Sequence, residues 1–413
     1  MKKSLLSFSL FLLALSLYAQ SNLDSLYGVW QDEQHSDSLR LDAYKTYIWD
    51  AYLFSKPDTA FLLCEAMIAF GEERKYPQAV YQAYTLQSIA YDLQGEFSKA
   101  MLLTEQSIEG NTALGNKAGL AEAEIVMGVL FQEQGIYPQA LIHFNKALVI
   151  NEEINNLEGM AMCFNNIGNI YNSQGNSSAA VENYKKALAI DEELGIKQGV
   201  AVETSNIGDI YAEQGNISQA FKYYERSRDL NQEIGDIYGL SGAFSSIGRL
   251  YEKEGQLSLA LDAYEKALSL VQEVGMMQEI AIKQTDLGRF YLLQGDHKKA
   301  MNYCQKAYTT SKENGAILTQ NSACECLYSV NKEIGDQAEA LSFFEEMAVL
   351  KDSIYNDDNT RKLTQIQMKY EFSKQEAARQ AEQDKKDALA QEELQRQKLV
   401  RNSFMGGFAV VLM

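Results

Sequence analysis

The chain has 413 residues, of which 46% are hydrophobic and only three are proline. This length exceeds that of an ordinary single domain, and so few prolines among abundant helix-forming residues favour an all-α structure. The formal net charge of −19 excludes general attraction to nucleic acid, because the phosphate backbone requires a concentrated basic surface.

The first residues, MKKSLLSFSLFLLALSLYAQ, have the layout of a secretory signal. Lys2 and Lys3 precede an apolar run, which small and polar residues close. We expect residues 1–19 to be a cleaved signal peptide, with Ala19 as the last residue removed. An uncleaved membrane anchor is the alternative, but the run is short for a hydrocarbon core that requires about 20 residues. Residues 20–40 would then lead into the next part of the chain.

From about residue 41 to residue 360 the sequence repeats every 40 residues. The marker of this period is a glycine, at Gly95, Gly135, Gly175, Gly215, Gly255, Gly295 and Gly335. An alanine stands five residues after each of them, at Ala100, Ala140, Ala180, Ala220, Ala260, Ala300 and Ala340. Because Ser55 and Ala60 occupy the same positions one period earlier, we expect eight units, of which the first is divergent.

The central units share two further positions. Seven residues before the marker stands a second glycine, at Gly128, Gly168, Gly208, Gly248 and Gly288. Three residues after that glycine stands an aromatic residue, at Phe131, Tyr171, Tyr211, Tyr251 and Tyr291. Apolar residues at helical spacing on both sides of the marker predict two helices that meet there, with a positive φ at the marker glycine. Small residues where two helices cross let the backbones approach, while aromatic rings fill the space beside them.

The order Leu/Ile-Gly-x-x-Tyr followed by Ala-x-x-x-Phe/Tyr resembles the tetratricopeptide repeat. Phe164 and Phe244 replace the tryptophan that opens the family's signature, and the period is 40 instead of about 34 residues. The resemblance implies a right-handed superhelical solenoid whose concave surface is lined by the first helix of each unit. The longer period would lengthen the helices by about 9 Å at about 1.5 Å per residue.

The resemblance also implies a ligand site on the concave surface. In the family, an asparagine two residues before the second glycine often contacts the backbone of a bound peptide. Asn166 and Asn206 match this position, whereas Ser246 and Asp286 depart from it. Side-chain amides can pair with both the donors and the acceptors of an extended backbone.

The residue directly after the second glycine changes along the chain, from Asn169 and Asp209 to Arg249 and Arg289. Two stacked arginines can bind a carboxylate through paired hydrogen bonds. We therefore expect the ligand to be a peptide or an acidic protein tail. The alternative is that these polar positions are merely solvated and that the arginines pair with nearby glutamates.

The sequence shows no other chemistry. His35, His143 and His297 lie apart, with no Cys or carboxylate at metal-ligand spacing, and are interpreted as surface or packing residues. The cysteines are odd in number, lack the spacing of a disulfide framework and are interpreted as packing residues: Cys64, Cys163, Cys304, Cys324 and Cys326. We expect no catalytic residue, no metal and no cofactor within these 413 residues.

The repeat ends near residue 360, and residues 361–401 predict a long charged helix without glycine or proline. Some apolar residues follow the 3,4,7 spacing of a marginal coiled coil: Leu363, Ile366, Tyr370 and Ala377. We expect a stalk that permits a homodimer, or else a single solvated helix. Residues 402–413 carry no ionisable side chain and predict the start of a transmembrane helix that is cut short.

The segments WDAYLFSKPDTAF and QRQKLVRNSFMGGFAVV, together with the repeats, resemble the sensor half of Bacteroidetes membrane signalling proteins. This resemblance implies exported, periplasmic repeats that a single C-terminal span attaches to the cytoplasmic membrane. It implies an adenylate/guanylate cyclase or a histidine kinase as a further domain. The expected function is a non-catalytic binding module, acting as a sensor or scaffold. The alternatives are a structural envelope scaffold that transmits nothing, or an enzyme whose catalytic domain lies outside these residues.

Overall fold

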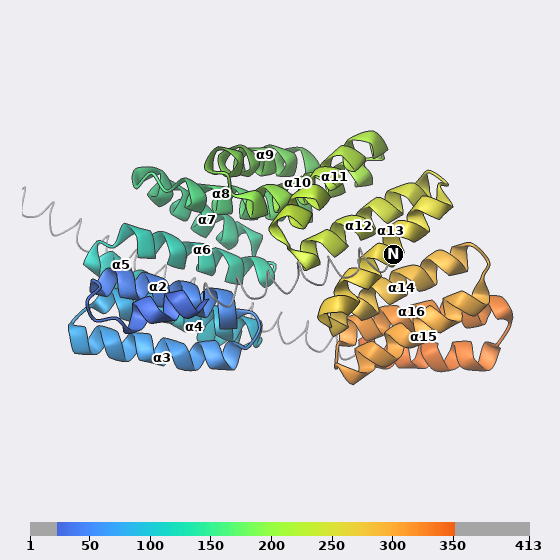
Figure 1. Cartoon of the computed structure of the whole chain (residues 1–413), viewed down its shortest axis with the longest axis horizontal. Helices are drawn as coiled ribbons and strands as arrows, with labels where there is room; N and C mark the ends of the chain where they lie inside the picture. The colour runs from blue at the N-terminus through green and yellow to red at the C-terminus, as the bar shows by residue number, and fades with distance from the viewer. Residues whose placement is uncertain (1–22, 352–413) are drawn as a thin grey trace, which may run out of the picture. The chain divides into compact units, whose positions relative to one another are not determined.

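Residues 23–351 are described by a computed structural model, in which helices follow one another in stacked pairs (Figure 1). After a helix over residues 23–31, the first helices of the pairs are α2 (Asp37–Ile48) with its π-helical continuation η1 (Trp49–Leu53), α4 (Pro77–Leu93), α6 (Lys117–Glu133), α8 (Leu157–Ser173), α10 (Lys197–Glu213), α12 (Ile237–Lys253), α14 (Met277–Leu293) and α16 (Ile317–Ile334). The second helices are α3 (Pro57–Arg74), α5 (Phe97–Leu114), α7 (Tyr137–Glu153), α9 (Ser177–Leu194), α11 (Ile217–Ile234), α13 (Leu257–Val274), α15 (His297–Glu313) and a helix over residues 337–351. Residues 23–351 thus form an all-helical repeat solenoid, as expected.

Marker glycines make the turn within every pair except the first, where Ser55 takes their position. Their predicted positive φ is confirmed, since φ lies between 70° and 85° at all seven positions. At Gly175 the glycine N–H bonds to the Asn172 carbonyl at 2.9 Å, and the next N–H, of Asn176, bonds to the Tyr171 carbonyl at 2.8 Å. These two bonds satisfy carbonyls that the helix end leaves without a partner, and only glycine adopts the required left-handed conformation without cost.

A second set of turns, between one pair and the next, was missed by the sequence analysis. Glycines with φ between 66° and 78° end these second helices: Gly115, Gly195, Gly235, Gly275 and Gly315. Lys75 and Asn155 take the same position in two units, both with φ of 54°. The signal was present, because these residues recur with the same period of 40, twenty residues after each marker or, for Lys75, after Ser55.

The core of the five central pairs is built on the second glycine of the first helix. A Cβ on Gly168 would lie 2.6 Å from the ring of Tyr184, and one on Gly208 would lie 2.8 Å from the ring of Tyr224. The aromatic residue of the second helix therefore packs directly on the backbone of the first. The alanines five residues after the marker are fully buried at the same crossing, among them Ala180, Ala220 and Ala260. Tyr171, Tyr211 and Tyr251 are half-buried beside it.

Cys304 takes the place of the aromatic residue in one unit. Cys304 of α15 and Cys326 of α16 form a disulfide, with Cα atoms 5.8 Å apart, beside Gly288. The interpretation of all five cysteines as packing residues is therefore wrong for this pair. Cys64, Cys163 and Cys324 are buried and free, as packing residues would be.

The expected signal peptide (1–19), stalk (361–401) and transmembrane start (402–413) all lie outside the described residues. Among the helices of residues 23–351, none is both long enough and apolar enough to cross a membrane.

Candidate ligand-binding face

We call the exposed side of the first helices the first-helix face. On this side of the stack, successive helices lie close together. Successive first helices contact each other directly, as α4 does with α6 and α14 does with α16. Successive second helices also meet through long side chains, as Arg226 of α11 does with Glu192 of α9. A repeat stack whose first helices lie close together offers there a continuous surface to which many units contribute.

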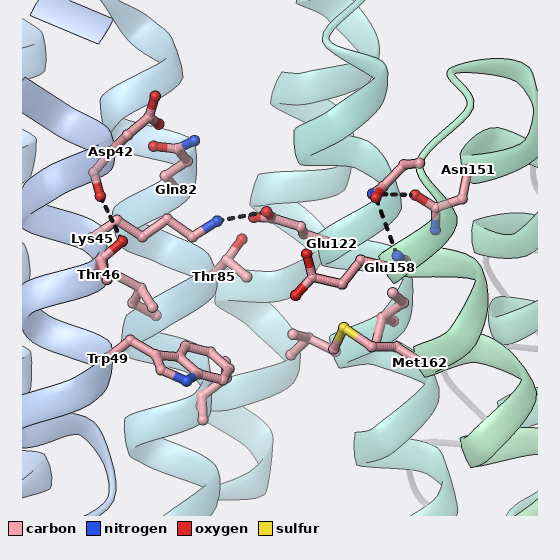
Figure 2. Close-up of a pocket in the computed structure, with 16 residues that line it drawn as sticks. Asp42, Lys45, Thr46, Trp49, Gln82, Thr85, Glu122, Asn151, Glu158 and Met162 are labelled. Carbon is pink, nitrogen blue, oxygen red and sulfur yellow. Dashed lines mark hydrogen bonds and ion pairs between the residues drawn. The ribbon is translucent and has the colours of Figure 1, made fainter. Parts of the chain in front are cut away.

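A pocket of about 440 Å³ lies in the first-helix face of the first four units (Figure 2). Side chains from α2, η1, α4, α6, α7 and α8 line it. Its apolar wall consists of Trp49, Leu86, Ile89, Ile125, Val126 and Met162. The residues that line the pocket from one helix follow a spacing of three and four, as Gln82, Leu86 and Ile89 do on α4, so each helix turns one side into the same space.

Trp49 owes its place to a change in helix type. It is the first residue of η1, where α2 widens into a π-helical turn. Such turns are rare and are frequently found at functional sites. The Trp49 side chain is 38% exposed and that of Met162 44%, although both are large and apolar. Figure 2 shows the two on opposite sides of the pocket.

The polar residues of the pocket carry a net negative charge. Three carboxylates, Asp42, Glu122 and Glu158, face a single ammonium, that of Lys45. Lys45 Nζ lies 2.5 Å from Glu122 Oε1, so this ion pair joins α2 to α6 (Figure 2). Burial raises the pKa of Asp42, Lys45 lowers it, and the charge of Glu122 raises it again. Gln82 Oε1 is buried without a hydrogen-bond partner among the described residues.

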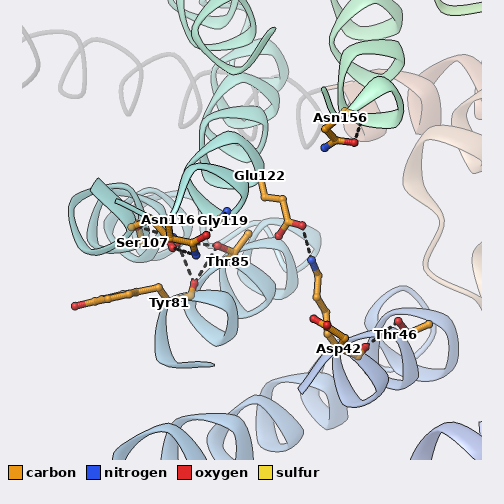
Figure 3. Close-up of polar contacts among 12 residues, drawn as sticks. Asp42, Thr46, Tyr81, Thr85, Ser107, Asn116, Gly119, Glu122 and Asn156 are labelled. Atoms are coloured by element: carbon orange, nitrogen blue, oxygen red, sulfur yellow. Dashed lines mark hydrogen bonds and ion pairs between the residues drawn. The ribbon is translucent and has the colours of Figure 1, made fainter. Parts of the chain in front are cut away.

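Buried hydrogen bonds hold the helices around the pocket in place. Thr85 Oγ1 lies 2.8 Å from Ser107 Oγ, which joins α4 to α5 (Figure 3). At the start of α8, the Asn156 side chain accepts a bond from the Gly159 N–H at 3.2 Å and donates one to Asn151 Oδ1 at 2.9 Å. The folded state loses stability when one partner of a buried hydrogen bond is removed, so these bonds fix the positions of the lining helices.

The asparagines predicted to contact a ligand lie on the same face, further along the chain. Asn166 is half-buried, and its Nδ2 donates to the Met162 carbonyl at 2.9 Å. Asn206 is half-buried at the same position of the next unit. Asn169 and Asp209 are engaged within their own pairs, since Asn169 Oδ1 accepts from the Tyr184 hydroxyl at 2.8 Å and Asp209 Oδ1 accepts from the Tyr224 hydroxyl at 2.5 Å.

The two predicted arginines are exposed on the first-helix face but differ in their contacts. Arg289 forms an ion pair with Glu325 of the following first helix, at 3.1 Å. Arg249 donates to Ser246 Oγ at 2.9 Å, and its positive charge lowers the pKa of Asp286, which burial raises more strongly. Pairing with a nearby glutamate, the alternative weighed from the sequence, is therefore present for Arg289.

Sequence reasoning missed the pocket and found only its polar continuation. The position after the second glycine is Asn169, Asp209 or Arg249 in later units, whereas the equivalent residues of the first two units are Trp49 and Ile89. Comparing these positions across all units would have shown an apolar start and a polar continuation of the face.

Another pair of side chains was also missed. His143 Nδ1 lies 2.5 Å from Glu124 Oε2, and both side chains are buried between α6 and α7. Its sequence neighbours suggested that His143 is isolated from carboxylates, but in the fold it is not. No group of three potential metal ligands gathers anywhere in residues 23–351.

Comparison with known protein families identifies the repeats. Family models described as tetratricopeptide repeat match residues 119–193, 201–273 and 284–314. The tetratricopeptide repeats expected from the sequence are thus confirmed for these three segments. No curated protein sequence matches it.

Several solved structures share the fold. The apo quorum sensor NprR of B. thuringiensis has a TM-score of 0.60 at 14% identity, over 82% of this chain and 99% of its own. A Rap protein in complex with Competence and Sporulation Factor has a TM-score of 0.54 at 13% identity, over 83% and 99%. A plasmid Rap conjugation gene regulator in complex with a Phr peptide has a TM-score of 0.51 at 14% identity, over 82% and 96%. Identities this low show the fold alone.

Proposed function

We propose that residues 23–351 form a non-catalytic module that binds a peptide or an extended protein segment along the first-helix face. The observation that carries this proposal is the pocket of about 440 Å³ with apolar and polar walls, which lies on the same face as the half-buried amides and the exposed arginines. Ligand sites are typically concave and largely apolar, with a few polar groups that orient the ligand. Similar folds crystallised as a quorum sensor and with a bound peptide support the class of ligand.

In this proposal the module is the extracytoplasmic sensor or scaffold of a membrane-attached signalling protein. Three segments outside the described residues support it. The signal-like residues 1–19 support export, and the apolar residues 402–413 support attachment to a membrane. The charged segment 361–401 supports contact between two copies in a dimer. The Cys304–Cys326 disulfide supports export, because disulfides persist in oxidising compartments. A sensor requires two arrangements with different ligand affinities, whereas a scaffold requires only one.

Export can be tested on the protein expressed in a bacterial host with its own first residues. We expect amino-terminal sequencing of the mature chain to begin at Gln20, because Ala19 ends the predicted signal. Replacing Ala19 with a bulky residue such as tyrosine should leave the precursor uncut. A mature chain that still begins at Met1 and remains in the cytoplasm would contradict the proposed location.

The polar half of the face can be tested with an acidic peptide, for example a fluorescent hexapeptide of alternating Glu and Leu. Replacing both Arg249 and Arg289 with alanine should weaken its binding about tenfold or more, because a charge-assisted bond contributes about 1.5 to 3 kcal/mol. Fluorescence anisotropy measures the change. The control is Arg226→Ala with Arg228→Ala, which removes the same charge from the second helix α11 and should leave affinity unchanged. Equal affinity of both double variants would remove the arginines from the site.

A further inference from the structure

The pocket in the first four units has a chemistry of its own, which specifies one end of the ligand. We infer that this pocket binds a cationic group joined to an apolar side chain: an ammonium or guanidinium beside Glu122 and Glu158, with the apolar part against Trp49 and Met162. This inference rests on the proposed function, because it names what part of a bound peptide the pocket selects.

The apolar requirement follows from the wall of the pocket. Trp49 and Met162 are large side chains that remain 38% and 44% exposed, and buried Leu86 and Ile125 continue the same wall. Covering such a wall with an aliphatic or aromatic side chain removes apolar surface from water, which is favourable in proportion to the area covered. A wholly polar ligand would leave this surface hydrated.

The cationic requirement follows from the charges and hydrogen-bonding groups. Lys45 supplies one positive charge among Asp42, Glu122 and Glu158, so two negative charges remain in excess. Gln82 Oε1 is a buried acceptor that still lacks a donor. An ammonium supplies three hydrogen-bond donors and a guanidinium five, and neither carries an acceptor. Both therefore match a site that is rich in acceptors. A ligand carboxylate would add a fourth negative charge beside the single lysine.

Binding of a cation in the pocket would affect a contact between units, the Lys45–Glu122 ion pair. It is the side-chain link between α2 and α6, which belong to the first and third units. A cation that binds Glu122 competes with Lys45 for the same oxygen, so ligand binding acts directly on a contact between units. At the later units the exposed arginines carry the opposite charge, so a bound peptide would be oriented with its cationic end at the pocket.

Trp49 provides a local readout, because the chain contains only two tryptophans. The other, Trp30, stacks on Tyr44 with ring centroids 4.2 Å apart and does not line the pocket. In the Trp30→Phe background, the fluorescence of Trp49 therefore reports occupancy of the pocket. Three probes separate the sources of the cation: Leu-Ala-Ala amide with a free amino terminus, N-acetyl-Leu-Lys-Ala amide, and the neutral N-acetyl-Leu-Ala-Ala amide.

We expect at least one of the two cationic probes to change the Trp49 emission saturably, with a dissociation constant about tenfold or more below that of the neutral probe. The probe that binds identifies the source of the cation as a peptide amino terminus or a lysine side chain. Glu122→Gln with Glu158→Gln should abolish this preference. Glu158→Gln alone, at an exposed side chain, should reduce it in a chain whose thermal unfolding is unchanged. The control, Glu192→Gln with Glu193→Gln on α9, should keep it.

The inference is overturned if the neutral probe binds as tightly as both cationic probes, or if none of the three changes Trp49 emission at about 10 mM, where even weak contacts are populated. The Arg249 and Arg289 experiment then separates the two failures. If the acidic peptide still binds through those arginines, only the assignment of the pocket is lost. If that peptide does not bind either, the proposed function is lost with it.

Discussion

Gly168→Ala is expected to lower the free energy of unfolding by about 2 to 3 kcal/mol, the upper part of the range for overpacked cores. The new methyl group would lie 2.6 Å from Cε1 of Tyr184, well inside van der Waals contact. The ring cannot move aside easily, because it is only 1% exposed and its hydroxyl bonds to Asn169 on the first helix. Urea unfolding followed by far-UV circular dichroism measures the loss.

Gly242→Ala is the matched control. Gly242 also lies within a first helix, α12. A Cβ added to it would have no atom of another part of the chain within 4 Å. Alanine is about 1 kcal/mol more favourable than glycine inside a helix, so this variant should be as stable as the parent chain or slightly more stable. If both variants unfolded at the same urea concentration, the close contact between helices at Gly168 would not be a determinant of stability.

Glu203→Gln is expected to stabilise the protein at pH 8 by up to about 4 kcal/mol, since each unit of pKa shift corresponds to about 1.4 kcal/mol and the group is half ionised at a pH equal to its pKa. Glu203 is 3% exposed and neighbours Asp191, which is 5% exposed. Burial raises the pKa of Glu203 from 4.5 to about 8, although a hydrogen bond from Asn165 Nδ2 at 2.9 Å lowers it. The neutral amide of glutamine avoids the cost of burying the carboxylate and can still donate to Asp191.

The pH dependence of stability gives the sign of this effect. Between pH 4.5 and about 8, the folded chain keeps the Glu203 proton that the unfolded chain releases. The folded state therefore binds more protons, and stability falls as the pH rises through this window. Urea unfolding at pH 5 and pH 8 should show a smaller decrease for Glu203→Gln than for the parent chain. The exposed variant Glu193→Gln should behave like the parent, and a Glu203→Gln chain with the parent's pH slope would contradict the assignment.

Much of the fold could be predicted from the sequence because it rests on short-range requirements. A glycine at a left-handed turn and apolar residues at helical spacing act over a few residues, and the 40-residue period displays each requirement several times. The same period contained the second set of turns, at Gly115 and its equivalents, which the analysis did not use. Lys75 and Asn155 interrupt that set, since they adopt the same φ without being glycine.

The candidate site was predicted only in part. Its polar residues stand at repeated positions of the sequence, whereas its pocket is formed by side chains from several helices. Asn166, Asn206, Arg249 and Arg289 occupy repeated positions on single helices, and a repeat register is sufficient to place them on one face. The register does not show which neighbours they bond to. Arg289 proved to be paired with Glu325, 36 residues later in the chain.

The sequence by itself determined that the chain is a stack of paired helices, where each pair turns and which side of the first helices is polar. Only the tertiary structure decided that Lys45 meets Glu122, 77 residues away, that Cys304 meets Cys326, and that a pocket lined by Trp49 opens in the first four units. The physical reason is range. Helix and turn preferences are set by adjacent residues, whereas a pocket or an ion pair between units depends on the angle at which separate helices pack, and that angle is the sum of many side-chain contacts.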